Sequence, residues 1–171
     1  MSLRNLGLEQ IPLFQLHRID AKVPVADQIG ELKMLQDEGV IGHIGLSEVT
    51  VAQLQEAQQT AEIVTVQNMY NLTTRSAAEL LEHAEKHDIG FIPWFPLATG
   101  KLTQGDGPLA DIARRHDASP SQIALAWLLQ RSPVMLPIPG TSSVDHVEDN
   151  IAAAGVELSA ADVKALDGMA G

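Results

Sequence analysis

Several polar or aromatic groups in this sequence lie near the end of an apolar run of strand length. They are His17, Ser47 with Glu48, Gln67 with Asn68, Trp94, and the segment Pro139-Gly140-Thr141. In a parallel barrel of strands and helices, the carboxyl ends of the strands carry the loops that bind substrates. An imidazole, an amide and an indole at that end could bind and orient a polar organic molecule. Their shared position, more than any one of them, indicates a binding site.

Each of these groups also has an ordinary structural interpretation. A single strand histidine is more often a hydrogen-bonded core group than a catalyst. Gln67 could be a buried amide satisfied by the backbone, and Trp94 could pack in the core. Thr141-Ser142-Ser143, before a helical pattern, offers hydroxyls for an N-cap. The same exposed amides and helix dipole could bind a phosphate, so the residues alone leave both interpretations open.

Composition restricts the class of protein. The 171 residues are 45% hydrophobic with a mean hydropathy near zero, which predicts one globular domain over 1–171. A net charge of -11 argues against nucleic acid and anionic membranes as partners. The absence of cysteine excludes disulfides and thiolate metal sites, and no metal is expected. No apolar run approaches the roughly 20 residues of a membrane span, and no signal-peptide run opens the chain, so we expect a cytoplasmic protein.

Strand-like runs and helical patterns alternate along the chain. The strand-like runs cover 11–19, 41–46, 63–69, 90–95 and 134–138. Helical patterns follow every run, and those after the last two cover 109–116, 122–129, 144–153 and 160–169. Four N-caps are predicted, each with Gln, Glu or Asp three residues later: Thr50, Ser76, Ser119 and Ser159.

About five parallel βα units in this length favour a partial TIM (β/α)8 barrel in the α/β class, because a complete barrel needs about 250 residues. An open doubly wound sheet is the alternative, but no Gly-x-Gly-x-x-Gly follows a strand here. The polar residues at several strand ends also favour the barrel.

The sequence resembles the aldo-keto reductases nearly from end to end. The segments that carry the resemblance are 3–7, 16–17, 33–39, 44–47, 66–68, 93–97, 139–142 and 148–150. The resemblance implies a (β/α)8 barrel of which this chain is the C-terminal part, from the fourth strand onward, with the first three strands missing. It also implies reduction of an aldehyde or ketone by hydride transfer from NADPH, with NADH as the alternative.

By position, the resemblance implies roles for residues of this chain. His17 corresponds to the active-site histidine that bonds the carbonyl oxygen of the substrate. Trp94 corresponds to the aromatic residue that stacks on the nicotinamide ring, and Ser47 and Gln67 hold the carboxamide. The segment along the pyrophosphate comprises Phe95, Pro96 and Leu97. The residues that bind the adenosine end are Gly140, Thr141, Ser142, His146 and Asn150.

The chain also departs from the family pattern. Glu48 stands where many members have asparagine, and Gly140 and His146 stand where many have lysine and arginine for the 2'-phosphate. The family's general acid is a tyrosine, tuned by a lysine and an aspartate, and these come from strands before the start of this chain. Tyr70, the one tyrosine here, does not match that position.

A positioned general acid is worth about a hundred- to ten-thousand-fold in rate, so we expect the isolated chain to be nearly inactive. The alternatives are a non-catalytic nucleotide-binding or scaffolding module, and a fragment without a function of its own. Removing strands from a barrel leaves unpaired edges, so self-association through them is also expected.

Overall fold

The computed structural model describes residues 2–98 and 107–169, in which strands and helices alternate. The first half of the chain forms α1 (Ser2–Leu6), β1 (Ile11–Leu16), α2 (Val25–Asp37), β2 (Ile41–Ser47), α3 (Val51–Gln58), β3 (Ile63–Met69), α4 (Ala78–Lys86) and β4 (Gly90–Trp94). The second half is helical, with α5 (Pro108–Arg115), α6 (Pro120–Arg131), α7 (Val144–Ala152), the short 3-10 helix η2 (Ala153–Gly155) and α8 (Ala160–Asp167).

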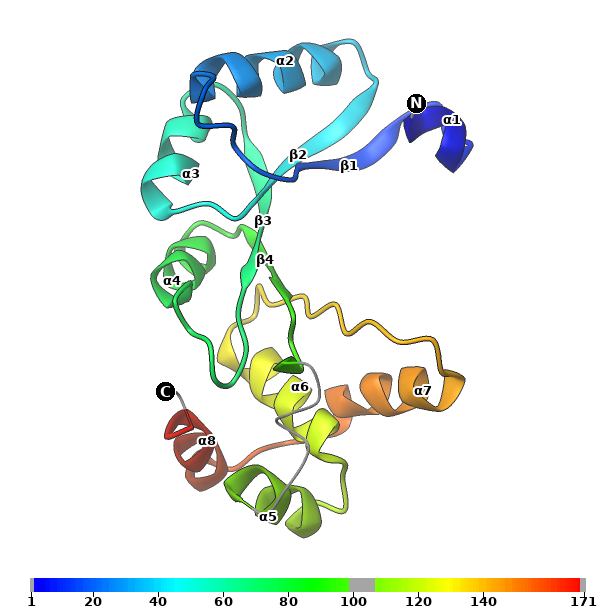
Figure 1. The fold of residues 1–171 in the computed structure, drawn as a ribbon, viewed down its shortest axis with the longest axis vertical. Helices are drawn as coiled ribbons and strands as arrows, with labels where there is room; N and C mark the ends of the chain where they lie inside the picture. The colour runs from blue at the N-terminus through cyan, green and yellow to red at the C-terminus, as the bar shows by residue number, and fades with distance from the viewer. Residues whose placement is uncertain (1, 99–106, 170–171) are drawn as a thin grey trace.

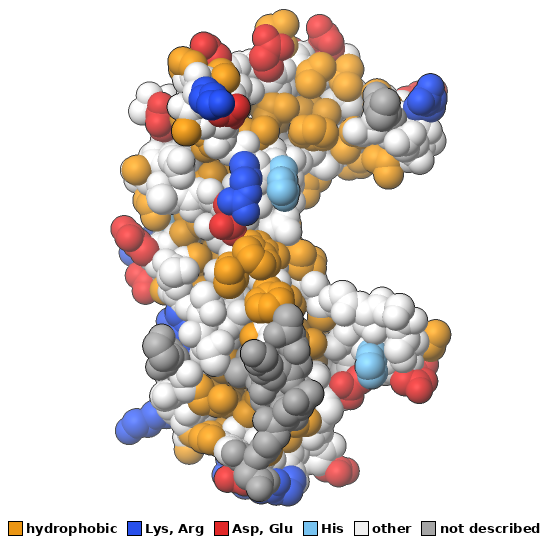
Figure 2. All heavy atoms as spheres, viewed as in Figure 1, with side chains coloured by type: hydrophobic (Ala, Val, Ile, Leu, Met, Phe, Trp, Pro, Cys, Tyr) orange, Lys and Arg blue, Asp and Glu red, His pale blue; other side chains and the backbone are white. Residues whose placement is uncertain are grey.

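The four strands form one parallel sheet in the order β1-β2-β3-β4. Helices α2, α3 and α4 lie along the same side of this sheet (Figure 1). Figure 2 shows the opposite side hollowed, between the N-terminal part of the chain and the arm that carries α7. The strand order and the one-sided helix layer confirm the predicted α/β class with parallel strands.

The predicted fifth strand at 134–138 is wrong, because only Met135 forms a bridge, with Phe91 of β4. The Phe91 N–H donates to the Val134 carbonyl, and the Leu136 N–H donates to the Phe91 carbonyl, both at 2.8 Å. The next donor along this edge of β4 would be Pro93, which has no N–H. The ladder stops there, so the sheet has four strands and a one-residue bridge in place of five strands.

Three of the four predicted N-caps are confirmed. Thr50, Ser119 and Ser159 each accept a hydrogen bond from the backbone N–H three residues later, and the side chain at that later position bonds back. Ser76 is not a cap, because α4 begins at Ala78 after a turn that is closed by a bond from the Ala78 N–H to the Arg75 carbonyl, at 3.0 Å.

Aromatic side chains connect the sheet to α6. Residues 123–128 of α6 are all buried. The ring of Trp127 stacks on Tyr70, just after β3, with centroids 5.9 Å apart and planes 9° apart. Tyr70 also meets Phe91 edge to face at 5.9 Å. These three aromatic rings fix the sheet against the C-terminal helices.

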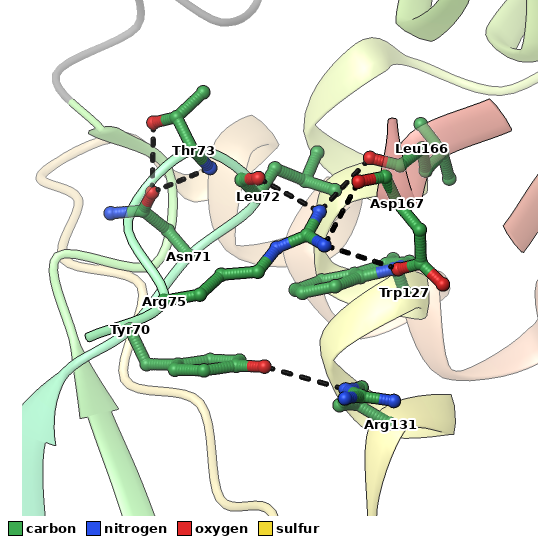
Figure 3. A network of polar contacts seen from close by, with 9 residues as sticks. All are labelled: Tyr70, Asn71, Leu72, Thr73, Arg75, Trp127, Arg131, Leu166 and Asp167. Carbon is green, nitrogen blue, oxygen red and sulfur yellow. Dashed lines mark hydrogen bonds and ion pairs between the residues drawn. The ribbon is translucent and has the colours of Figure 1, made fainter. Parts of the chain in front are cut away.

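A guanidinium group joins the same two parts of the chain (Figure 3). Arg75, in the turn before α4, donates to the carbonyls of Leu72 and Leu166 at 2.9 and 3.0 Å, and to the Asp167 carbonyl at 3.1 Å. The centre of its guanidinium lies 4.6 Å from the centroid of the Trp127 ring. Because these carbonyls end a loop and a helix, Arg75 holds α8 against the turn after β3.

Candidate functional site

The ends of β2 and β3 lie side by side and share hydrogen bonds. Ser47 pairs with Gln67 in the ladder, and the Ser47 hydroxyl donates to the Gln67 main-chain carbonyl at 3.0 Å. Ser47 is buried, whereas Gln67 is half-buried. Within the described residues, the Gln67 side-chain amide makes no hydrogen bond. The strand ends therefore present an amide whose donor and acceptor have no partner among the described residues.

A close contact fixes the sheet one step below this amide. The Gln15 amide donates to the Thr65 hydroxyl at 2.9 Å, across Gly45 of the strand between them. A Cβ atom at Gly45 would lie 2.2 Å from the Thr65 hydroxyl oxygen and 2.8 Å from Gln15 Cγ. Gly45 is therefore required by the approach of these two side chains, which fixes the three strands beneath Ser47 and Gln67.

Glu48 joins the ends of three strands. Its backbone has a φ of 56°, in the left-handed region, and its N–H donates to the Gln67 carbonyl at 2.9 Å. One carboxylate oxygen, Oε1, accepts from the Met69 N–H at 3.2 Å and from the Trp94 indole N–H at 2.5 Å. The carboxylate after β2 therefore fixes the end of β3 and the edge of the indole at the end of β4.

Trp94 and the residues after it form the exposed side of this group. Trp94 is half-buried, and Phe95 is 39% exposed with a left-handed φ of 61°. The two rings lie 5.9 Å apart and are tilted by 53°. The side-chain amide of Asn71, which is fully buried, donates to the Phe95 carbonyl at 3.1 Å. The turn after β4 is thus held from within, while aromatic surface stays accessible.

Asn71 and Glu48 have structural roles that were not predicted from the sequence. The Asn71 side-chain oxygen accepts from the N–H groups of Thr73 and Thr74 at 3.0 and 2.9 Å, which is an Asx turn. An asparagine two residues before a Thr-Thr pair was the signal for this turn. For Glu48, the signal was Trp94 at a strand end, because a partly buried indole N–H needs an acceptor.

His17 lies at the same end of the sheet, one residue beyond β1. Its side chain is exposed, and no hydrogen bond joins it to the other predicted site residues in the described part of the chain. Pro96 is buried and Leu97 is half-buried. The structure therefore brings Ser47, Gln67 and Trp94 to neighbouring strand ends and leaves His17 just beyond the end of the edge strand β1.

The predicted adenosine-end residues form a separate group around the start of α7. Thr141 Oγ1 accepts from the Ser143 N–H at 3.1 Å and lies 3.4 Å from His146 Nδ1. The His146 N–H donates to the Ser143 hydroxyl at 3.4 Å, which confirms a hydroxyl cap here. Gly140, Thr141, Ser142 and His146 are exposed, and Asn150 is half-buried. This group is held by local contacts and presents its polar atoms to solvent.

Charge and shape near α7 are distinctive. The stretch 139–150 contains three acidic residues, no lysine and no arginine, so His146 is its single side chain able to carry a positive charge. Asn150 lines a mostly apolar pocket of about 320 Å³ together with Pro139, Leu125 and Ile151. A flat apolar ring with polar edges fits such a pocket. A 2'-phosphate next to that ring would find only His146 as a possible cation within 139–150.

The residues between α3 and α4 form a third feature. A pocket of about 260 Å³ there is lined by both Glu48 and Glu79. Asn68 points to this side, because its amide bonds the main-chain N–H and carbonyl of Val49 at 3.3 and 3.0 Å. Among residues 2–98 and 107–169 there is no group of three His, Asp or Glu side chains placed to bind a metal. No helix in the same ranges is long and apolar enough to cross a membrane.

Comparison with known proteins gives consistent matches. The model of the aldo/keto reductase family matches residues 1–170. Uncharacterized oxidoreductase C215.11c of Schizosaccharomyces pombe is 55% identical over 159 residues, which is 93% of this chain and 52% of that protein. Pyridoxine 4-dehydrogenase of Escherichia coli is 40% identical over 174 residues, which is 98% of this chain and 60% of that protein.

Solved structures of aldo-keto reductases share the fold of this chain. The crystal structure of an aldo-keto reductase from Klebsiella pneumoniae in complex with NADPH has a TM-score of 0.90 and 28% sequence identity. The match covers 98% of this chain and 61% of that one. The chain therefore spans 52% to 60% of the length of these two curated relatives, and nearly all of it superimposes on the solved structure.

Proposed function

Because the chain belongs to the aldo/keto reductase family, we propose that it provides the nicotinamide site of an oxidoreductase that reduces an aldehyde or ketone. The observation that carries this proposal is that the partly accessible ring of Trp94 and the side-chain amide of Gln67, which no described residue bonds, lie at the ends of the neighbouring strands β4 and β3. The cofactor, when bound, supplies the hydride. The residues of this chain bind it and orient it.

The chemistry of these side chains fits a nicotinamide. A carboxamide needs one acceptor and one donor, and the Gln67 amide offers both. The Ser47 hydroxyl has its proton engaged by the Gln67 carbonyl, so its oxygen remains an acceptor. The Trp94 indole is held at its edge and offers a face for stacking. No metal ion is needed for this arrangement.

The remaining cofactor contacts follow the family pattern. We propose that the pyrophosphate lies along Phe95, Pro96 and Leu97. The adenosine end would be bound by Gly140, Thr141, Ser142, His146 and Asn150. NADPH is supported by the Klebsiella pneumoniae relative, which was solved with it. The lack of lysine and arginine over 139–150 supports NADH as a usable alternative.

We propose that β1 to β4 and the bridge at Met135 correspond to the fourth to eighth strands of a (β/α)8 barrel. The outer edge of β1 and the 38% exposed Leu13 on it would then be contact surface in a complete barrel. In the isolated chain this edge can pair with another chain, so self-association through the open edges remains part of the proposal. A cytoplasmic location also remains a prediction.

For catalysis, we propose that His17 bonds the carbonyl oxygen of a small substrate. Tyr70 cannot supply the proton, because it is fully buried, stacked on Trp127 and bonded to Arg131 at 3.3 Å. Since the chain has no other tyrosine, the isolated 171 residues are expected to bind the cofactor with little turnover. This observation favours a second candidate function, a non-catalytic nucleotide-binding module.

Titration of the purified chain with NADPH, followed by protein fluorescence, tests the proposal. We expect saturable binding at micromolar cofactor, weakened at least tenfold in Trp94→Ala and largely retained in Trp94→Phe, which keeps a ring to stack. NADPH consumption with a reactive aldehyde separates the two candidates, because turnover requires a general acid. Absence of any binding by the wild-type chain would refute the proposed cofactor site.

A further inference from the structure

The Glu48 side chain carries a negative charge that its two hydrogen bonds do not require. Its Oε1 accepts from two N–H donors, of Met69 and of the Trp94 indole, and a glutamine or asparagine oxygen could accept both bonds. The negative charge is therefore not required to satisfy these donors. It is an additional property of this side chain.

Among residues 2–98 and 107–169, no cationic side chain forms an ion pair with Glu48. The ion pairs within the described residues involve other carboxylates, those of Asp37, Asp111, Asp162 and Asp167. Glu48 is half-buried, so water screens its charge only in part. A carboxylate that forms no ion pair with any described residue, bonded to the edge of the Trp94 indole, therefore makes the space over that indole favourable for positive charge.

We propose that Glu48 is a specificity-determining residue that makes this site bind the oxidised nicotinamide cofactor more tightly than the reduced one. The inference rests on the proposed function, which stacks the nicotinamide on Trp94. The oxidised ring carries a positive charge and the reduced ring carries none, so the carboxylate stabilises only the oxidised complex. A partly screened carboxylate next to the ring is worth about a tenfold difference in affinity between the oxidised and the reduced cofactor.

Tighter binding of the oxidised form has a chemical consequence. The potential of the bound cofactor becomes more negative, by about 30 mV for each tenfold difference in affinity of a two-electron couple. The bound reduced cofactor is then the stronger hydride donor. Glu48 would therefore favour reduction of the carbonyl on the protein and slow the release of the oxidised cofactor.

The test compares the dissociation constants of NADP⁺ and NADPH by calorimetry, for wild type and Glu48→Gln. The glutamine oxygen keeps an acceptor for the Trp94 and Met69 N–H groups and removes the charge. We expect the affinity ratio of oxidised to reduced cofactor to fall about tenfold in the variant. Glu79→Gln is the control, because Glu79 lines the pocket between α3 and α4 together with Glu48 but is exposed and makes no bond to Trp94. Its ratio should equal that of wild type.

The outcomes separate the two proposals. If both forms bind and the ratio is the same in wild type and Glu48→Gln, the charge has no role and this inference is wrong, while the cofactor site stands. If Glu48→Gln weakens both forms equally, Glu48 acts only as a support for Trp94, which also overturns the inference. If wild type binds neither form, the proposed function fails, and the inference falls with it.

Discussion

The two tryptophans of this chain each donate an indole N–H to a carboxylate, but in opposite surroundings. Trp127 is 1% exposed and bonds Asp167 at 3.1 Å. Trp94 is half-buried at a strand end and bonds Glu48 at 2.5 Å. The same pairing of groups thus occurs once with a buried indole and once with a partly exposed one.

The neighbours of the two pairs explain the difference. The Trp127 ring contacts Tyr70 and Arg75, and Arg75 also forms an ion pair with Asp167 at 3.4 Å (Figure 3). This pair therefore includes a cation, Arg75, and a buried indole, while the Asp167 side chain is 41% exposed. The Trp94 pair has no cation in the described residues and leaves part of the ring accessible. A closed pair stabilises the fold, whereas an open one provides a surface and a charge for a ligand.

Arg75→Met should give the largest effect, because the carbonyls of Leu72, Leu166 and Asp167 and the Asp167 carboxylate each lose a guanidinium donor. We expect a loss of about 2–4 kcal/mol in the free energy of unfolding, measured by urea denaturation. Arg114→Met is the matched control, since its pair with Asp111 is exposed and worth about 0.5 kcal/mol or less. Equal losses in both variants would mean that the buried network does not support the fold.

Trp127→Phe and Trp94→Phe compare the contributions of the two indole N–H groups to stability and to cofactor binding. Each removes one indole N–H and keeps an aromatic ring. We expect Trp127→Phe to lower the free energy of unfolding by about 1–2 kcal/mol without changing cofactor affinity, because Asp167 loses a buried donor. Trp94→Phe should cost less than about 0.5 kcal/mol. The reverse order of stabilities would contradict the assignment of the closed pair to structure.

A third carboxylate, that of Asp162, also stabilises the fold, and its contribution to the free energy of unfolding depends on pH. Hydrogen bonds from the Ser159 hydroxyl at 2.7 Å and from His116 at 3.1 Å lower the pKa of Asp162 from 3.8 to about 2. A lowered carboxyl pKa stabilises the fold above the unfolded value near 4, and this contribution is lost as the pH falls toward 2.

Allowing for solvent screening, we expect Asp162→Asn to cost about 1 kcal/mol at pH 7, and the difference from wild type to vanish near pH 2. Urea denaturation at a series of pH values measures it. A difference that stays constant from pH 7 to pH 2 would show that the carboxylate charge contributes nothing.

Local patterns predicted much of the fold. The strand at 63–69 and the caps at Thr50, Ser119 and Ser159 are where the sequence analysis placed them. These features depend on residues within a few positions of one another. Of the two errors, one depends on a distant residue, because Pro93 denies a donor to the predicted fifth strand. The other is local, because the turn closed by the bond between Ala78 and Arg75 moves the start of α4 past Ser76.

The candidate site was predictable in part for the same reason. Placing Ser47, Gln67 and Trp94 at strand ends needs only strand lengths and parallel order. The bond between Glu48 and Trp94 joins residues 46 apart in sequence. It depends on the register across β2, β3 and β4 and on a left-handed residue after β2, neither of which a single sequence specifies.

The most direct test of the account is a nitrogen-correlated proton spectrum of the chain, in which Trp94 and Trp127 give the two indole N–H signals. Trp94→Phe assigns them by removing one. On addition of NADP⁺, we expect the Trp94 signal to shift saturably and the Trp127 signal to stay in place. A Trp94 signal that does not move at saturating cofactor, or a shift confined to Trp127, would contradict the claim that the open pair is the binding surface.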